Sequence, residues 1–278
     1  MKKYSEKNRK AGIVLPVLMI LCLGIMVFSL YKLVTISMEY RQSEKEYDIL
    51  QSYITEKTEP EDEMAESAEQ LDQEEETQRK AASRDTGCSI TVDFEHLREI
   101  NPDLVCWLYI PALELSYPVV QGRDNEQYLH HTFEGTENFA GSIFVDANIR
   151  EPLVMPHTIL YGHNMKNQTM FGKLKLLLQE ELYREEPWFW ILTPQGEEKY
   201  QIIDIRYTDA LSSTYTLFEE PDNEYLAYLE EILAGTMMER KQLPEISENS
   251  RLVTLSTCAS SEGTERLVVQ GIAVESSP

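Results

Sequence analysis

The sequence predicts a mainly β fold in which largely antiparallel strands close into a barrel and helices lie at its periphery. Many short apolar runs of strand length follow one another from about Val92 to the C-terminal end. Turn residues separate these runs at close spacing, and only a few segments show the three- and four-residue spacing of apolar side chains that is typical of helices. With 278 residues, the chain is long enough for one substantial domain and accessory segments.

The chain begins with a basic tail that precedes a long uncharged segment. Five of the first ten residues are Lys or Arg and one is Glu, whereas Ala11–Leu30 carries no charge. About 20 apolar residues of helix span a bilayer core about 30 Å thick, and the apolar region of a cleaved signal peptide is shorter, at about 7 to 15 residues. We therefore expect a cytoplasmic tail at residues 1–10, an uncleaved transmembrane signal-anchor at residues 11–34, and the remainder outside the cell.

An acidic segment follows the expected anchor and holds much of the formal charge of −23. Between Glu56 and Glu76 there are eleven acidic residues and one Lys, with too little apolar content to form a core. We expect residues 35–87 to be an extended extracellular linker, although Ser37–Thr55 can continue a helix from the anchor. Because the sequence has few basic stripes and no interleaving of aromatic and basic residues, it argues against nucleic acid as a partner.

A folded domain is expected from residue 88 to residue 278. Asp93 is suited to cap a short helix, Phe94–Ile100, which Asn101-Pro102 ends. Apolar runs between turn residues predict the strands of the barrel, at 105–110, from 117, and at 141–146, 158–162, 189–192, 200–205, 251–258 and 267–269.

Two further segments have helical periodicity. Apolar residues in Thr169–Leu178 recur at helical spacing and predict a helix on the barrel surface. The long connection between Tyr207 and Arg251 contains a start signal at Pro221-Asp222-Asn223 and an amphipathic pattern that ends at Gly235. We therefore expect a helix inserted before the last strands.

Three of the four cysteines are expected to be structural. Cys22 lies in the apolar N-terminal segment. Cys88 and Cys106 either form a disulfide or, as we favour, remain separate thiols. Adjacent His130 and His131 point in different directions and make a poor metal pair, so no metal is expected there.

Cys258 differs from the other cysteines because it ends an apolar run in front of a polar loop. This position presents a thiol to solvent on rigid support, and a buried inert cysteine is the alternative interpretation. A thiolate near neutral pH needs a base or a positive neighbour. The candidates are His163, which also follows an apolar strand, and Arg266, which begins the strand after Cys258.

Three motifs stand out: TLSTC at Thr254–Cys258, YGHNM at Tyr161–Met165 and an Arg eight residues after the Cys. Together they resemble the sortase family, the membrane-anchored cysteine transpeptidases of Gram-positive cell surfaces. The resemblance covers roughly residues 92–275 and favours class B because of the inserted helix, the N-terminal helix and the run Tyr117–His131. It implies an eight-stranded barrel with peripheral helices, including an N-terminal helix and the inserted one.

The resemblance also implies a reaction. Cys258 would attack the Thr carbonyl in the C-terminal sorting signal of a secreted protein, in an Asn-Pro-x-Thr-like or Leu-Pro-x-Thr-like motif. His163 would transfer protons and Arg266 would stabilise the oxyanion or hold the peptide. The acyl group would pass to an amine of peptidoglycan or of its lipid-linked precursor, without a metal or an organic cofactor. Two alternatives stay open, namely a pilin-polymerising sortase with a Lys acceptor and an inactive, membrane-anchored binding module.

Five residues resemble positions that line the class B peptide groove: Asn125, Leu129, Tyr215, Thr216 and Ser256. Leu129 and Tyr215 are otherwise interpreted as core residues. The chain departs from the family at Thr216, where a branched aliphatic residue is usual, and at Ala259-Ser260, where an acidic residue often follows the Cys. These departures concern the peptide preference and not Cys258, His163 or Arg266.

Overall fold

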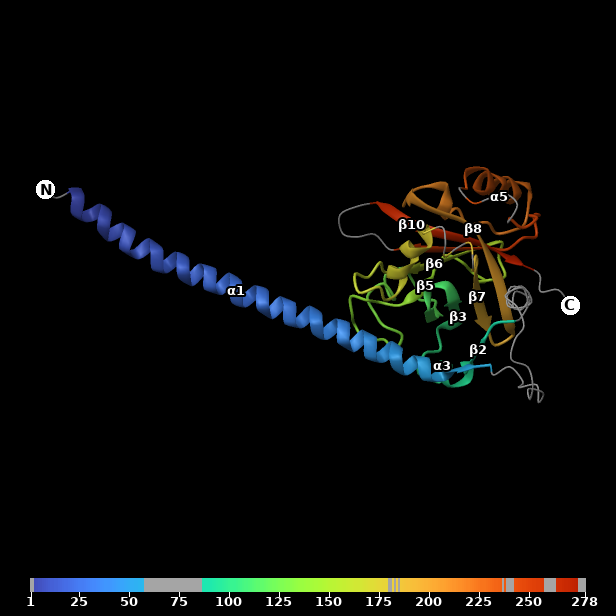
Figure 1. Ribbon diagram of the computed structural model, residues 1–278, viewed down its shortest axis with the longest axis horizontal. Helices are drawn as coiled ribbons and strands as arrows, with labels where there is room; N and C mark the ends of the chain where they lie inside the picture. The colour runs from blue at the N-terminus through green and yellow to red at the C-terminus, as the bar shows by residue number, and fades with distance from the viewer. Residues whose placement is uncertain are drawn as a thin grey trace, which may run out of the picture. The chain divides into compact units, whose positions relative to one another are not determined.

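The computed structural model describes residues 3–57, 87–179, 182, 184, 186–236, 238, 243–257 and 264–274. The chain divides into two compact units, Met1–Lys45 and Glu46–Pro278. The first unit consists of most of helix α1 (Lys3–Leu50), which is one continuous helix (Figure 1). The helical stretch from Leu18 to Tyr53 contains an 18-residue window with a mean hydropathy of 2.2, and it is long and apolar enough to cross a membrane. The helix is therefore compatible with membrane anchoring.

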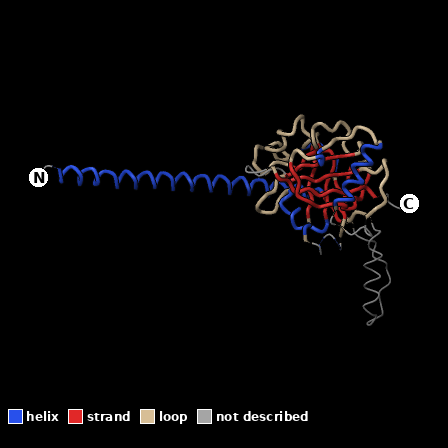
Figure 2. Tube along the Cα trace, turned by 90° about the horizontal axis from the view of Figure 1, so that it is seen from above, coloured by secondary structure: helices blue, strands red, loops and turns tan. Residues whose placement is uncertain are grey.

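Eight strands of the second unit form a closed barrel, which confirms the predicted fold class. The strands lie at the centre of this unit and loops surround them (Figure 2). The order around the barrel is β10, β8, β7, β3, β4, β5, β6 and β9. Their bounds are β3 Leu104–Ile110, β4 Leu115–Val120, β5 Ile143–Val145, β6 His157–Gly162, β7 Trp188–Thr193, β8 Gly196–Asp209, β9 Leu252–Thr257 and β10 Glu265–Val274.

Strands β6 and β9 pair in parallel, although most of the barrel is antiparallel. The register pairs Tyr161 with Ser256 and Gly162 with Thr257. Strand β10 pairs with β9 in the antiparallel sense, with Val268 opposite Ser256. The carboxyl ends of β6 and β9 therefore meet at one edge of the barrel, where the beginning of β10 also lies.

The two α-helices of the second unit that the sequence predicts are present. In α3 (Phe94–Ile100), the Asp93 carboxylate accepts a hydrogen bond from the His96 amide at 3.2 Å. In α5 (Asn223–Gly235), Asp222 accepts from the Tyr225 amide at 2.9 Å. Figure 1 shows α5 against the wall formed by β8 and β10. Its buried face packs on Ile203, Leu252 and Ile272, so α5 covers one side of the barrel.

The segment Thr169–Leu178, for which the sequence predicts a helix, is helical from Phe171 onward. It forms a 3₁₀ helix, η4 (Phe171–Leu178), and short 3₁₀ helices also occur at Gln51–Tyr53 (η1), Pro111–Leu113 (η3) and Ser213–Tyr215 (η5). Phe171, Leu174 and Leu177 are fully buried, and a three-residue spacing stacks side chains on one face of a helix with three residues per turn. A Cβ at Gly172 would meet the Met165 carbonyl oxygen, so η4 lies close to the preceding loop.

Part of the expected linker belongs to the second unit. The side chains of Tyr47 and Leu50 are buried, and β1 (Ile54–Glu56) pairs antiparallel with β2 (Ile90–Val92). These residues fall within 35–87, for which the sequence predicts a linker. A short polar run with scattered apolar side chains gives no local indication that it will pair with a strand far along the chain. Most of the acidic segment, residues 58–86, lies outside the described residues.

We expect Leu50→Ala to lower the free energy of unfolding by about 2–5 kcal/mol, because it leaves a cavity at a fully buried position. The control is Ile49→Ala on the same helix, where the side chain is 58% exposed and the expected change is within about 0.5 kcal/mol. Chemical denaturation of the full chain in detergent micelles, followed by tryptophan fluorescence, measures both. Equally small losses would place the end of α1 outside the cooperative unit.

Candidate active site

His163 follows β6 and is held by two backbone contacts. Its Nε2 lies 2.8 Å from the carbonyl oxygen of Leu129, and its own carbonyl accepts a hydrogen bond from the Phe171 amide at 3.0 Å. A carbonyl oxygen only accepts, so Nε2 carries a proton and Nδ1 is the nitrogen that can take one up. Burial lowers the pKa of His163, and the bond to Leu129 opposes this shift only in part. The neutral imidazole is therefore favoured.

The end of β9 is fixed to its neighbours on both sides. The Ser256 hydroxyl is buried and lies 2.8 Å from the Tyr215 hydroxyl. The Thr257 hydroxyl accepts a hydrogen bond from the Leu267 amide of β10 at 3.0 Å. Cys258 is the next residue along the chain and lies outside the described residues. The structure therefore describes the strand up to Thr257, the residue directly before the predicted nucleophile.

Arg266 lies on β10 opposite Thr208 of β8 and is partly buried. One guanidinium nitrogen, Nη1, is fully buried and has no hydrogen-bond partner among the described residues. Leaving a buried donor unpaired is costly, and such a group is usually explained by a ligand, a water or a catalytic role. Arg266 therefore holds a donor available for a further partner near the end of β9.

Asn125 takes part in a network that fixes a loop next to β6. Its amide donates to Asp146 Oδ2 at 3.2 Å, and its carbonyl oxygen accepts from the Ala147 amide at 2.8 Å. The Tyr161 hydroxyl donates to the same carboxylate oxygen at 3.0 Å. Leu129 is half-buried, and its carbonyl holds His163.

Tyr215 joins the two parallel strands. Its ring stacks on that of Tyr161 with centroids 6.3 Å apart and planes at 19°, while its hydroxyl contacts Ser256 of β9. The side chain of Thr216 is exposed, but its carbonyl accepts from Nδ1 of His157 at 2.8 Å. The structure therefore brings Tyr215 and Ser256 together and connects them through Tyr161 to Asn125. It shows no such contact for the Thr216 side chain.

Sequence reasoning missed three residues of this region, namely Asp146, Tyr161 and His157. Asp146 is buried and also accepts from the Asn148 amide at 2.8 Å. His157 is fully buried at the start of β6. A charged or polar residue inside an apolar strand pattern was the available signal for both, because such a group needs buried partners. Among the described residues, no group of three or more His, Cys, Asp or Glu side chains could hold a metal ion.

Three of the four cysteines are among the described residues, and the fourth, Cys258, is not. Cys88 and Cys106 are free thiols and both are buried. Burial raises the pKa of Cys88 to about 11 and raises that of Cys106 as well, so neither thiol is a good nucleophile near neutral pH. Separate thiols at these positions agree with the interpretation that the sequence favoured.

The closed eight-stranded barrel is that of a sortase, and the chain belongs to this family. The family model "Sortase domain" matches residues 108–274. Within the family the chain is of class B. It is 30% identical to sortase B of Listeria monocytogenes over 196 residues, covering 69% of this chain and 78% of the relative. It is 32% identical to sortase B of Staphylococcus aureus over 178 residues, covering 63% and 72%.

A solved Staphylococcus aureus sortase B–substrate complex shares the fold. It has a TM-score of 0.61 and 28% identity and covers 73% of this chain and 95% of that chain. Sortases are cell-surface cysteine transpeptidases that act on proteins with sorting signals. The protein is accordingly a cell-wall sorting transpeptidase.

Proposed function

We propose that the protein cleaves the sorting signal of a secreted protein after Thr and transfers the acyl group to a peptidoglycan amine. The Cys258 thiolate adds to the Thr carbonyl, the peptide C–N bond breaks, and the departing amine takes a proton. This leaves a thioester on Cys258. An incoming amine then attacks the thioester, loses a proton and releases the thiol.

The register of β6 and β9 is the observation that carries this proposal. Gly162 pairs with Thr257, and His163 and Cys258 follow these two residues along the chain. Val268 lies opposite Ser256, and Arg266 lies two residues before Val268 on β10. Both pairings lead to the same end of the barrel, which supports a site formed by Cys258, His163 and Arg266.

The state of His163 supports a role in proton transfer. Its neutral form is favoured by burial, and Nδ1 is the nitrogen able to accept a proton from the thiol. The same nitrogen then returns the proton to the departing amine. The buried, unpaired Nη1 of Arg266 supports a role in stabilising the developing oxyanion, because a desolvated donor acts more strongly there than in water.

The groove for the sorting signal is proposed to include Asn125, Leu129, Tyr215, Thr216 and Ser256. Tyr215 and Ser256 lie beside the ends of the two strands, and the exposed Thr216 side chain can contact a peptide. A class B relative has been solved as a substrate complex, which supports a substrate site in this family. We propose that the signal is either Asn-Pro-x-Thr-like or Leu-Pro-x-Thr-like, and the test below distinguishes the two.

The proposed topology has a single membrane span. Residues 1–10 remain in the cytoplasm, residues 11–34 span the bilayer, and the barrel lies outside. The uninterrupted helix α1 supports this arrangement because it contains the whole uncharged segment Ala11–Leu30. The acidic residues within 35–87 would extend as an extracellular linker segment between β1 and β2.

The test is intact-protein mass spectrometry of the full chain in detergent micelles, incubated with either peptide and with or without an added glycine or diaminopimelate-type amine. We expect one peptide to add the mass of its acyl fragment and an amine to clear it. Cys258→Ala should abolish the adduct completely. An adduct cleared only by a pilin Lys peptide would favour pilin polymerisation. Folded protein without any adduct would favour an inactive binding module.

A further inference from the structure

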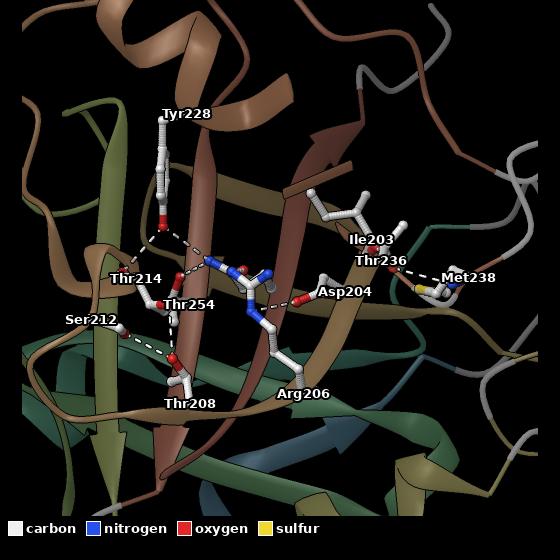
Figure 3. A network of polar contacts seen from close by, with 11 residues as sticks. Ile203, Asp204, Arg206, Thr208, Ser212, Thr214, Tyr228, Thr236, Met238 and Thr254 are labelled. Atoms are coloured by element: carbon white, nitrogen blue, oxygen red, sulfur yellow. Dashed lines mark hydrogen bonds and ion pairs between the residues drawn. The ribbon is translucent and has the colours of Figure 1, made fainter. Parts of the chain in front are cut away.

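Four buried polar side chains form a cluster between α5 and the barrel wall. These residues, called the polar cluster here, are His157 of β6, Tyr228 of α5, Thr254 of β9 and Gln270 of β10, and each is less than a tenth exposed. Figure 3 shows Tyr228 directed from α5 toward Thr214, with Thr254 close by. Buried polar groups are costly unless they are hydrogen-bonded, so the contacts of this cluster need an explanation.

The direction of each hydrogen bond follows from the chemistry of its partners. His157 Nδ1 faces the Thr216 carbonyl at 2.8 Å, so Nδ1 carries the proton. Burial lowers the pKa of His157 to about 4, which keeps the ring neutral and makes Nε2 an acceptor for the Thr254 hydroxyl at 2.8 Å. The Gln270 amide donates to Thr254 Oγ1 at 3.0 Å and to the Tyr228 hydroxyl at 3.4 Å.

The polar cluster ends at two backbone carbonyls of the same loop. The Tyr228 hydroxyl donates to the Thr214 carbonyl at 3.2 Å, and His157 donates to the Thr216 carbonyl. The residue between them is Tyr215. One continuous series of hydrogen bonds therefore holds the backbone carbonyls of the two residues that flank this tyrosine.

Tyr215 is the residue of this loop that reaches the candidate active site. Its hydroxyl lies 2.8 Å from Ser256 Oγ, and its ring stacks on Tyr161. Ser256 and Tyr161 each lie two residues before the proposed catalytic residue of their strand. A shift of the loop would thus move the side chain that touches both strand ends.

We propose that His157 and Tyr228 are positioning residues, which hold the loop around Tyr215 in the geometry that the sorting signal binds. The inference rests on the proposed function, because it assigns the sorting signal to this face. His157, Tyr228 and Phe218 also pack ring against ring, so truncating either polar residue would damage the core. The hydroxyl of Tyr228 can be removed without loss of the ring, and this separates positioning from packing.

The test compares Tyr228→Phe and Thr254→Val with a matched control, Tyr225→Phe. Tyr225 is a buried tyrosine on the same helix, but its hydroxyl donates to the carbonyls of Pro156 and Ser250. For Tyr228→Phe and Thr254→Val we expect hydrogen exchange of the amides in residues 210–218 to rise about fivefold, as for loss of one hydrogen bond. The peptide KM should rise by a similar factor with kcat within about twofold. Tyr225→Phe should change neither quantity.

A double-mutant cycle with Tyr215→Phe decides whether the effect passes through Tyr215. In that background, Tyr228→Phe should change KM by less than about twofold, because coupled residues are not additive. The proposal would be overturned if Tyr228→Phe raised KM by its full factor in the Tyr215→Phe background. It would also be overturned if Tyr228→Phe changed hydrogen exchange at residues 210–218 no more than Tyr225→Phe does. The exchange measurement needs no substrate, so failure of the proposed function is recognised separately, as a native protein that forms no acyl adduct.

Discussion

His163→Ala should reduce kcat/KM for acylation of Cys258 about a thousandfold, within the range found for loss of a general acid–base. The physical reason is that the buried, neutral imidazole is fixed by the Leu129 carbonyl and supplies the one proton acceptor we assign to the thiol. The thermal midpoint should stay within a few degrees, because the side chain is only half-buried. Adduct formation by mass spectrometry and melting by circular dichroism measure the two effects.

The matched control is His131→Ala, which removes another half-buried histidine. His131 Nδ1 lies 2.7 Å from the Gln127 carbonyl, so the contact is of the same kind in a neighbouring loop. We expect this variant to retain kcat/KM within about fivefold. A collapse of the fold in His163→Ala, or an equal loss of activity in both variants, would assign His163 a structural role.

The pH profile gives an independent check on His163. Because burial lowers the pKa of this group, its neutral form persists below the ordinary histidine value. The acid limb of kcat/KM in the native protein should therefore lie below about pH 6.5. This limb should be lost from the residual activity of His163→Ala.

Local sequence patterns were sufficient to predict those elements whose conformation is determined within a short segment. The period of apolar residues in α5 and the Asp222 cap are properties of a short segment, so the helix begins and ends where the sequence predicts. The strands β7 and β8 follow from two apolar runs around a Pro-Gln-Gly turn, and they pair as an antiparallel hairpin. In these cases the local preference and the tertiary contacts agree.

Elements that depend on distant partners could not be predicted in this way. The strand β1 gains its hydrogen bonds from β2, which lies beyond the whole acidic segment. The apolar spacing at Thr169–Leu178 predicts a helix, but it does not reveal that η4 is a 3₁₀ helix or that Gly172 lies close to Met165. Such features are decided by contacts between segments, and a periodicity in one segment carries no information about them.

The same distinction between local motifs and contacts among distant segments applies to the candidate site. The family motifs in the sequence predict His163, Cys258 and Arg266 as site residues, whereas the parallel register of β6 with β9 brings the carboxyl ends of two strands that are far apart in sequence to one edge of the barrel. Asn125 was expected to line a peptide groove, and the structure shows its side chain engaged with Asp146 and Ala147. Its effect on a peptide would therefore pass through the loop that it fixes, in which Asp146 also binds Tyr161.

Arg266→Ala should lower kcat/KM for acylation by a factor of about 10²–10³, the range for loss of one oxyanion donor. Arg266→Lys should be nearly as impaired, because an ammonium lacks the planar fork of donors that a guanidinium presents. Stability should change little, since the buried Nη1 has no hydrogen-bond partner among the described residues and its removal leaves no acceptor unpaired there. Rates of adduct formation and thermal midpoints are measured on the same samples.

Arg251→Ala is the control because it should show the opposite pattern. Arg251 donates to Glu198 Oε1 at 2.8 Å and to the Leu153 carbonyl at 3.0 Å, and it precedes the first residue of β9, at the opposite end of the strand from Thr257. Truncation of the Arg251 side chain removes both hydrogen bonds, so it should lower the thermal midpoint while kcat/KM stays within about threefold. If Arg266→Ala also lost stability in proportion to its activity, the guanidinium would be holding the barrel together, and the oxyanion would need another donor.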